Sequence, residues 1–428
     1  MKKILTKKIM SALQLEKNEV QPFLWSFTFF FSLLCSYYIL RPVRDEMGIQ
    51  GGINALQWVF SATFIVMLLV VPLFGWVVKR YSSVKLVPRV YYFFIVNLLI
   101  FYILFQSNVN NIFVARIFFI WVSIFNLFVV SIFWSFMSDI FTSKQARRMF
   151  GSIAAGGSAG AIFGPAITVL LSNILGQKKL LLVSVGFLVL SLICISKLIK
   201  IMKQDQRSLE KNDNIGGSIF AGITRVLQSP YLMGISLFIL LYSTLSTFLY
   251  FEQAHIIKNA FDSPESRTTL FAIIDLTVNT MTIFTQIFLT SRLVEKIGLS
   301  FTLMLIPVLV AVGFIALGFF PTLLTLVTFQ VIRRAGNYAV TRPAREMLYT
   351  TLPIQDKYKS KNFIDTVIYR GGDATSSWIF SGLKELGLNL SSLSFIAVPI
   401  AFIWALSGYL LGKAHKKKSS ISKESNEV

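Results

Sequence analysis

The feature that most constrains this chain is a series of twelve apolar segments, each about 20 residues long and separated by polar stretches. They lie near residues 22–40, 56–78, 86–106, 112–137, 150–175, 180–199, 230–251, 269–290, 300–320, 322–341, 363–383 and 394–412. About 20 apolar residues are what a helix needs to cross the ~30 Å hydrocarbon core of a bilayer. Because lipid offers the backbone no hydrogen-bond partner, each segment should be helical, and the alternating pattern of a membrane β-barrel is absent. We therefore predict an all-α, multi-pass integral membrane protein with twelve transmembrane helices.

The charge of the chain predicts its orientation in that membrane. The sequence has 41 Lys and Arg against 20 Asp and Glu, a net charge of +21. The basic residues are distributed along the loops and do not form one soluble patch, so we expect no nucleic-acid partner. Most lie in the tails and even-numbered loops, which predicts that both termini are cytoplasmic, with a bacterial inner membrane as the expected location. The basic tails, residues 1–21 and 413–428, should lie against anionic lipid headgroups.

The segments divide into two sets of six, separated by a mostly polar linker at residues 200–229. Residues 77–82 correspond to residues 293–298, and Gly156-Gly157 correspond to Gly371-Gly372, at nearly one offset of about 216 residues. Such an echo indicates a duplicated six-helix unit. We therefore predict an N-terminal bundle over residues 22–199 and a C-terminal bundle over residues 230–412.

This two-bundle arrangement resembles the major facilitator superfamily, in which two six-helix bundles enclose a central cavity that opens alternately to either side. The resemblance implies that the first, fourth, seventh and tenth helices line the cavity. In the loop after the second segment, Lys79 stands where that superfamily usually has an aspartate.

Glycines of the fifth segment form small-residue repeats at Gly156, Gly160 and Gly164. Such repeats permit close helix packing. We favour a packing seam over a direct substrate contact.

Two arginines and two carboxylates accumulate where the first apolar segment ends, at Arg41, Arg44, Asp45 and Glu46. A charged side chain in hydrocarbon costs at least ~2.5–3.5 kcal/mol, so it normally faces a polar cavity or a partner. Two interpretations stay open at this point. The charges line a cavity, or they mark the headgroup level, with Arg41 and Asp45 four residues apart and able to neutralise each other on one helical face.

Further charges fall inside other apolar segments or at their ends: Arg116, Glu252, Asp275, Arg333, Arg334, Asp365, Arg370 and Asp373, with Arg342 just after the tenth. Arg333 and Arg334 lie near mid-depth, which favours a cavity role, whereas Arg116 can extend to the headgroups. Arg370 and Asp373 share one polar stripe, so they should face the cavity or the neighbouring bundle. By the superfamily resemblance, Arg41, Arg116, Glu252, Arg333 and Arg342 border one chamber.

A chamber richer in arginine than in carboxylate should prefer an anion, since the planar guanidinium binds phosphate or carboxylate in a bidentate manner. We predict substrate binding by the arginines Arg41, Arg44, Arg116, Arg333, Arg334, Arg342 and Arg370. For coupling or gating we predict the carboxylates Asp45, Glu252, Asp275, Asp365 and Asp373.

Soluble-enzyme chemistry is not indicated. The chain has no GxxxxGK[ST] phosphate loop, and its two histidines, His255 and His415, are far apart. We expect no enzymatic activity, no metal site and no cofactor, and a monomeric protein.

Four short stretches resemble the bacterial and plastid ATP/ADP translocase family: residues 40–45, Phe133-Trp134, residues 148–151 and residues 361–367. The resemblance implies a nucleotide substrate whose phosphates are bound by a basic residue at the position of Arg44. Two charges of that family are replaced here, a lysine of the eleventh helix by Asp373 and a glutamate of the fourth by Val122.

The sequence therefore predicts a secondary transporter of an organic anion that works by alternating access, with nucleotide exchange of the ATP/ADP type as the narrower expectation. One alternative is a proton-coupled facilitator for another small solute, in which Asp275, Glu252 or Asp373 titrates. A second alternative is a non-transporting membrane receptor of the same fold.

Overall fold

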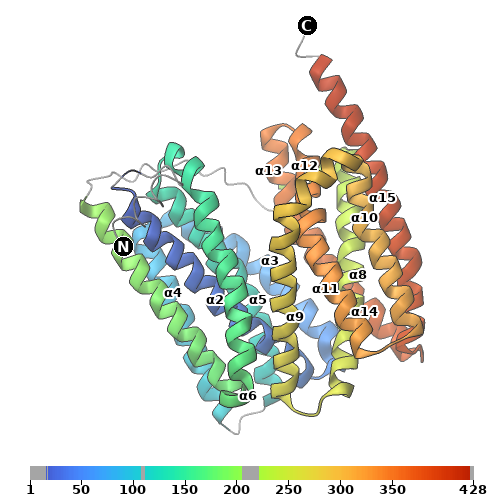
Figure 1. The fold of residues 1–428 in the computed structure, drawn as a ribbon, viewed down its shortest axis with the longest axis horizontal. Coiled ribbons are helices and arrows are strands. Elements are labelled where there is room, and N and C mark those ends of the chain that lie inside the picture. The colour runs from blue at the N-terminus through green and yellow to red at the C-terminus, as the bar shows by residue number, and fades with distance from the viewer. Residues whose placement is uncertain (1–15, 17, 108–110, 205–220, 425–428) are drawn as a thin grey trace. The chain divides into compact units, whose positions relative to one another are not determined.

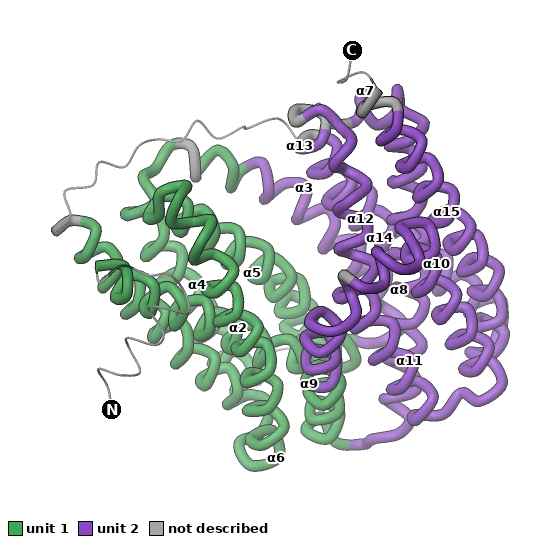
Figure 2. Tube along the Cα trace, turned by 45° about the horizontal axis from the view of Figure 1, so that its top comes forward, with its two compact units in different colours: residues 1–51, 73–215, 263–276 green, residues 52–72, 216–262, 277–428 purple. Residues whose placement is uncertain are grey.

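The computed structural model describes residues 16, 18–107, 111–204 and 221–424, and these residues form helices and no strand (Figure 1). The predicted all-α, twelve-helix membrane fold is confirmed. Nearly all of the basic N-terminal tail and residues 205–220 of the predicted linker lie outside the described residues. The structure divides into two compact units (Figure 2).

Unit 1 contains residues 1–51, 73–215 and 263–276. Its helices are α2 (Val20–Gln50), α4 (Ser83–Gln106), α5 (Asn111–Ile140) and α6 (Ser143–Gln204), with the ends of two helices shared with unit 2. The 62-residue α6 holds two predicted spans, because Gly176 interrupts it with φ +75° and ψ 157°. Glycine reaches this left-handed backbone region without steric cost, so the chain can reverse direction there.

Unit 2 contains residues 52–72, 216–262 and 277–428. Its helices are α7 (Ala221–Gln228), α8 (Pro230–Ala260), α10 (Thr290–Phe319), α11 (Leu323–Gly336), α12 (Arg342–Leu348), α13 (Ile354–Phe363), α14 (Tyr369–Glu385) and α15 (Leu390–Glu424). Short helical turns connect them: η1 (Ile53–Ala55), η2 (Asn337–Thr341), η3 (Tyr349–Thr351) and η4 (Ile364–Ile368).

Two helices are divided between the units. The first part of α3 (Leu56–Arg80) belongs to unit 2, and the first part of α9 (Pro264–Phe288) belongs to unit 1. Each therefore packs its first half with helices from the other half of the sequence. The domain boundaries at residues 22–199 and 230–412 follow the sequence order and stay a prediction.

The tenth and eleventh predicted spans each contain one turn of π-helix. These turns are η2, between α11 and α12, and η4, between α13 and α14. Each π-turn divides a longer helical stretch, so that α11 has 14 residues and α14 has 17 residues. Among the described residues, nine helices are by themselves long and apolar enough to cross a membrane, since these two are too short and α6 counts once. π-Turns occur often at functional sites, and both lie close to predicted site residues.

The glycine seam of the fifth span packs against α2. A Cβ added at Gly156 would lie 2.6 Å from the carbonyl oxygen of Phe27, and one at Gly164 would lie 2.8 Å from the Cβ of Tyr38. The corresponding Gly372 lies against α8, where an added Cβ would be 3.0 Å from Ser243 Oγ. Gly157, which meets Phe30 of α2, and its match Gly372 thus lie at equivalent helix pairs, the first with the fifth span and the seventh with the eleventh. Gly371, the match of Gly156, lies nearest Phe64 of α3.

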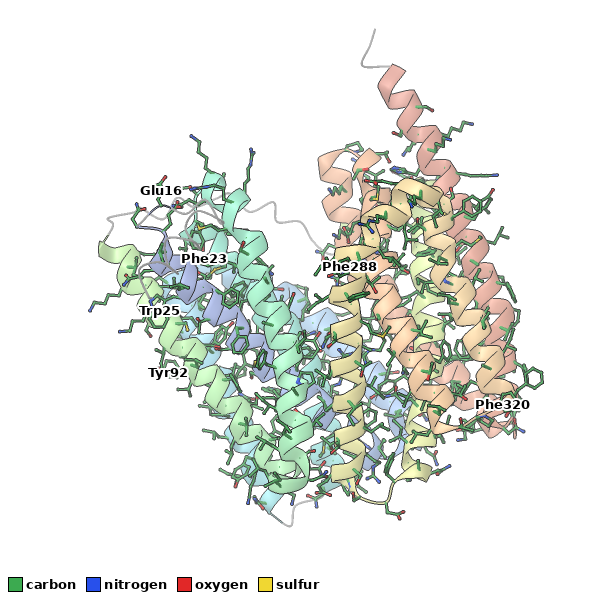
Figure 3. All side chains as sticks on the ribbon, in the orientation of Figure 1. Glu16, Phe23, Trp25, Tyr92, Phe288 and Phe320 are labelled. Atoms are coloured by element: carbon green, nitrogen blue, oxygen red, sulfur yellow. The ribbon has the colours of Figure 1, made fainter. Side chains whose placement is uncertain are left out.

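Large apolar side chains project away from both units along much of their length (Figure 3). Tyr92 on α4 is 61% exposed and Phe320 after α10 is 66% exposed. Extensive exposure of this kind is what the surface of a helix surrounded by lipid requires.

Candidate functional site

The charged end of α2 is tied to the first half of α9 within unit 1. Arg41 Nε lies 3.6 Å from Asp275 Oδ2, and Asp275 is 1% exposed. The Arg41 guanidinium also lies over the Tyr38 ring, 5.8 Å from its centroid. The structure thus brings two of the predicted site residues together, one from the arginine set and one from the carboxylate set.

A second bridge between the same helices joins two residues that the sequence analysis did not select. Arg267 donates from Nε and Nη2 to the two carboxylate oxygens of Glu46, at 2.8 and 2.7 Å. Glu46 is fully buried, and it also accepts a hydrogen bond of 3.0 Å from Gln50. This bidentate geometry gives the strongest type of side-chain ion pair.

Arg44 and Asp45 are neighbours in the chain and contact each other, with Arg44 Nη2 2.6 Å from Asp45 Oδ1. The Arg44 guanidinium also lies over the Phe119 ring of α5, 5.1 Å from its centroid. Arg41, for which the sequence suggested Asp45 as a partner on the same helical face, lies within ion-pair distance of Asp275.

Arg116 has a local structural contact. Its Nε donates a 2.7 Å hydrogen bond to the carbonyl oxygen of Gly51, directly after α2. The carbonyls at a helix end have no partner within the helix, so Arg116 fixes the end of α2 from the neighbouring α5.

The opposite end of unit 1 holds a third bridge, in which Glu19 Oε1 accepts from Arg148 Nη2 and Gln145 Nε2, both at 2.8 Å. Burial raises the pKa of Glu19. The hydrogen bonds from the Glu16 backbone and from Gln145, together with the Arg148 charge, outweigh this effect and hold the pKa below its ordinary value. Arg148 is part of the stretch at residues 148–151 and here fixes the start of α6.

In unit 2, Arg333 of α11 is buried among neutral groups. Arg333 Nη1 donates to Ser246 Oγ of α8 at 2.6 Å, and Nη2 donates to Gln330 Oε1 at 2.9 Å. Gln330 in turn donates to Gln253 of α8. Arg333 is 7% exposed, and its Nε has no hydrogen-bond partner within the described part of the chain.

The other predicted arginines of the tenth and eleventh spans differ in their surroundings. Arg334 is 9% exposed, whereas Arg342 is exposed at the start of α12. Arg370 Nη1 lies 3.3 Å from Asp373 Oδ2 one turn along α14. Asp373 also accepts hydrogen bonds from Ser243 at 2.6 Å and from Thr247 at 3.3 Å, both on α8.

A half-buried cluster of charges lies beside the π-turn η4. Arg345 Nη2 is 3.3 Å from Asp365 Oδ1, and Lys361 Nζ is 2.6 Å from Glu346 Oε2. Burial raises the pKa of Glu346, but the hydrogen bond and charge of Lys361 and the charge of Arg345 hold that pKa below its ordinary value. This cluster connects α12, α13 and η4.

Glu252 of α8 is fully buried, and Ser394 Oγ of α15 donates to its two carboxylate oxygens at 2.9 and 3.0 Å. Its surroundings therefore differ from those of Asp275, Asp45, Asp365 and Asp373, which all lie within ion-pair distance of an arginine.

Comparison with known proteins identifies the family of this chain. The model of the Major Facilitator Superfamily matches residues 23–344, about three quarters of the chain. The chain belongs to the major facilitator superfamily. No curated protein sequence matches the chain.

Solved structures of major facilitator transporters share the fold. A mutant of the nucleoside transporter NupG superposes with a TM-score of 0.65 at 11% identity, covering 91% of this chain and 99% of that one. A bacterial homologue of the iron transporter ferroportin, in an inward-facing state, also gives a TM-score of 0.65 at 11% identity, with 93% and 100% covered. The POT family transporter PepTSo gives 0.65 at 13% identity, with 94% and 99% covered. At these identities the similarity shows the fold alone, and the neighbours include carriers named for nucleosides, iron and peptides.

Within the superfamily, the narrower resemblance to ATP/ADP translocases stays a prediction. The Phe133-Trp134 pair of that resemblance lies in the packing of unit 1, where Phe133 is fully buried and stacks on Phe30 of α2, with ring centroids 4.1 Å apart. Val122, at the position of that family's glutamate, is also fully buried. The shared chamber predicted for Arg41, Arg116, Glu252, Arg333 and Arg342 likewise stays a prediction.

Sequence reasoning missed the residues that hold the predicted charges. Glu46 and Arg267 were visible as charges near span ends, but their partnership joins positions 221 residues apart. Ser246, Gln253 and Gln330 are uncharged and were not considered. Their polarity inside apolar segments was the signal that could have identified them.

Proposed function

We propose that this major facilitator protein is a secondary transporter of an organic anion, and that Arg333 contributes to the binding site. The observation that carries the proposal is the environment of Arg333. Arg333 is 7% exposed, and its side-chain hydrogen bonds in the described part of the chain go to a serine hydroxyl and a glutamine amide. No carboxylate of the described residues lies within ion-pair distance of it.

Burying an ion without a counter-charge is costly, because neutral dipoles compensate only part of the lost hydration. An anion that reached Arg333 would supply the missing charge. A guanidinium that already donates two hydrogen bonds is held in a fixed orientation, which lowers the entropy lost on binding. Its Nε is a buried donor with no hydrogen-bond partner in the described part of the chain. These properties support an anionic substrate better than a neutral or cationic one.

Nucleotides are the narrower proposal. Their phosphates match the fork of an arginine, and the translocase-like stretch at residues 40–45 is the sequence feature that favours them. The superfamily membership supports alternating access as the mode of transport, with exchange of one nucleotide for another as the expected reaction.

The test is uptake by proteoliposomes containing the purified protein, with labelled ATP, ADP, other nucleotides, and phosphorylated and carboxylated metabolites, with and without unlabelled substrate inside. A thermal-shift screen of the same compounds selects the ligands, since a ligand that binds the folded state raises its apparent stability. Uptake of a phosphorylated or carboxylated compound that internal substrate accelerates is the expected result. If no compound of either class enters the vesicles, the anion proposal is wrong.

The variant Arg333→Gln tests the site. Loss of a hydrogen bond to a charged group corresponds to about 1.5–3 kcal/mol, so affinity should fall roughly 10–150-fold. Arg333→Lys keeps the positive charge but loses the planar guanidinium, so its substrate affinity should lie between that of the wild type and that of Arg333→Gln. Arg292→Gln removes an exposed arginine of unit 2 and is the matched control. Unchanged affinity in Arg333→Gln would reject Arg333 as a substrate contact.

A further inference from the structure

Glu252 is distinguished by its lack of a cationic partner. Six carboxyl groups are buried among the described residues, and five of them lie within 4 Å of an arginine: Glu19, Asp45, Glu46, Asp275 and Asp373. Glu252 is 0% exposed, and among the described residues its side-chain hydrogen bonds come from the hydroxyl of Ser394 alone.

The charged groups and histidines on α8 and on the elements packed against it do not compensate Glu252. They are His255 and Lys258 on α8, Arg225 on α7, Arg333 and Arg334 on α11, Asp365 on η4, Arg370, Asp373, Lys384 and Glu385 on α14, and the basic residues of α15 from Lys413 onward. η1 carries no charge. None of these groups forms a hydrogen bond or ion pair with Glu252 in the described part of the chain. The ring of His255, one turn away, instead bonds the carbonyl oxygen of Phe251 at 2.9 Å.

The aromatic side chains next to Glu252 on α8 and one turn before it are buried against α14. Phe251 and Phe248 of α8 pack on Phe380 of α14, with ring centroids 5.0 and 5.3 Å apart, and these three rings are at most 1% exposed. An ionised carboxylate at this buried position loses its hydration, and the hydrogen bond from the Ser394 hydroxyl replaces only part of it. The neutral acid has no such penalty, so the site favours a bound proton.

A cavity lies one helical turn from this pair. It has a volume of about 530 Å³ and is lined by Ile256, Asn259 and Ala260 of α8, Pro321 and Leu323 beside α11, and Asn389, Leu390 and Ser391 at the start of α15. Ile256 follows Glu252 by four residues, and Leu390 precedes Ser394 by four, so the cavity lies along the same faces of both helices. One turn is about 5.4 Å along the axis. The polar side chains of Asn259, Asn389 and Ser391 can hold water there, within short reach of the carboxyl group.

We propose that Glu252 is a proton-binding site of this protein, loaded with a proton from water in this cavity. On loading, a proton from that water binds a carboxylate oxygen of Glu252 and gives the neutral acid. On release, the same oxygen returns the proton to water. The Ser394 hydroxyl serves both forms, since it donates to the carboxylate and can accept from the carboxylic acid.

The position of Glu252 also connects the proton to the proposed anion site, a step that rests on the proposed function. The next residue, Gln253, accepts a hydrogen bond from Gln330, which accepts one from Arg333. Glu252 and Gln253 therefore link the same turn of α8 to α15 and to α11. A change in the packing of Glu252 on protonation reaches Arg333 through the two hydrogen bonds of Gln253 and Gln330, which couples proton binding to anion binding.

The first experiment needs no substrate. Infrared difference spectra of the purified protein, recorded between acidic and alkaline buffer, report the C=O stretch of a protonated carboxylic acid. We expect a band in the wild type that is absent in Glu252→Gln and present in Glu385→Gln, a control at an exposed position. A band of unchanged intensity in Glu252→Gln, or no such band in the wild type, overturns the proposal.

Ser394→Ala covers the case in which Glu252→Gln does not fold. Removing the hydroxyl should keep the band but move it to higher frequency, because an acid without that hydrogen bond has a stiffer C=O bond. A band at the wild-type frequency would mean that another carboxyl group binds the proton.

Coupling is tested separately in proteoliposomes. With the anion identified by the uptake screen, an inward proton gradient should accelerate wild-type uptake, and Glu252→Gln should lose this acceleration while retaining exchange at equal pH. If no anion is transported but the infrared band depends on Glu252, the proposed function fails and the proton site stands. If the anion is transported and the gradient has no effect, the coupling is wrong.

Discussion

The bridge between Glu46 and Arg267 should be the most strongly coupled ion pair of unit 1. Its side chains are 0% and 10% exposed, and both carboxylate oxygens accept hydrogen bonds from the guanidinium. Arg267→Gln leaves the buried carboxylate of Glu46 with Gln50 as its remaining hydrogen-bond donor. Breaking a buried pair from one side typically costs about 3–5 kcal/mol, because the other charge stays buried.

The expected change in unfolding temperature follows from the size of the chain. An unfolding entropy of ~2.1 cal/mol/K per residue gives about 0.9 kcal/mol/K for 428 residues. A loss of 3–5 kcal/mol should therefore lower the unfolding temperature by about 3–6 °C in Arg267→Gln. Differential scanning fluorimetry of the detergent-solubilised protein measures this shift. Lys258→Gln, which removes an exposed cation, should change it by less than about 1 °C.

The double variant decides whether the two residues act as a pair. Glu46→Gln combined with Arg267→Gln replaces two charges with two amides, so no isolated charge remains buried. It should be more stable than the sum of the single variants predicts, by about 2 kcal/mol. Single-variant effects that add to within ~0.5 kcal/mol would refute the pairing.

Two further predictions concern helix packing. Gly160→Ala should destabilise unit 1 by about 1–3 kcal/mol, since a Cβ there would overlap the carbonyl oxygen of Phe31, and Gly151→Ala, where nothing lies within 4 Å, is its control in the same fluorimetry assay. Gly151→Ala should be neutral or slightly stabilising, and equal effects of the two changes would contradict a packing seam. Ser243→Ala removes the 2.6 Å hydrogen bond to Asp373 and should cost about 1–3 kcal/mol, measured as a loss of unfolding temperature. No loss would mean that Arg370 and Thr247 satisfy that carboxylate without Ser243.

The spans were predictable because a single physical requirement determines them. A helix needs about 20 consecutive, mostly apolar residues to cross the bilayer, and such a run can be recognised directly in the sequence. The break at Gly176 was also predictable in principle, since glycine beside two lysines separates two apolar runs. The π-turns η2 and η4 were not, because each is one additional residue in a helical turn and leaves no mark on hydropathy.

The partners of the charges depend on helix rotation and depth, which no local pattern encodes. Arg116 and Arg333 are both arginines inside apolar segments and were both predicted to bind substrate, although only Arg116 was expected to be able to extend to the headgroups. The structure gives Arg116 a backbone carbonyl at the end of α2, so its charge fixes a helix end. Arg333 is 7% exposed and donates hydrogen bonds to two neutral side chains. No described residue therefore neutralises its charge. The same reasoning separates Glu252 from Asp275: one carboxyl group has a serine and the other an arginine. A buried charged group therefore indicates a function most clearly when its neighbours do not neutralise its charge. Arg333 and Glu252, both in unit 2, meet this criterion. Anion binding should depend on Arg333, and proton binding should depend on Glu252.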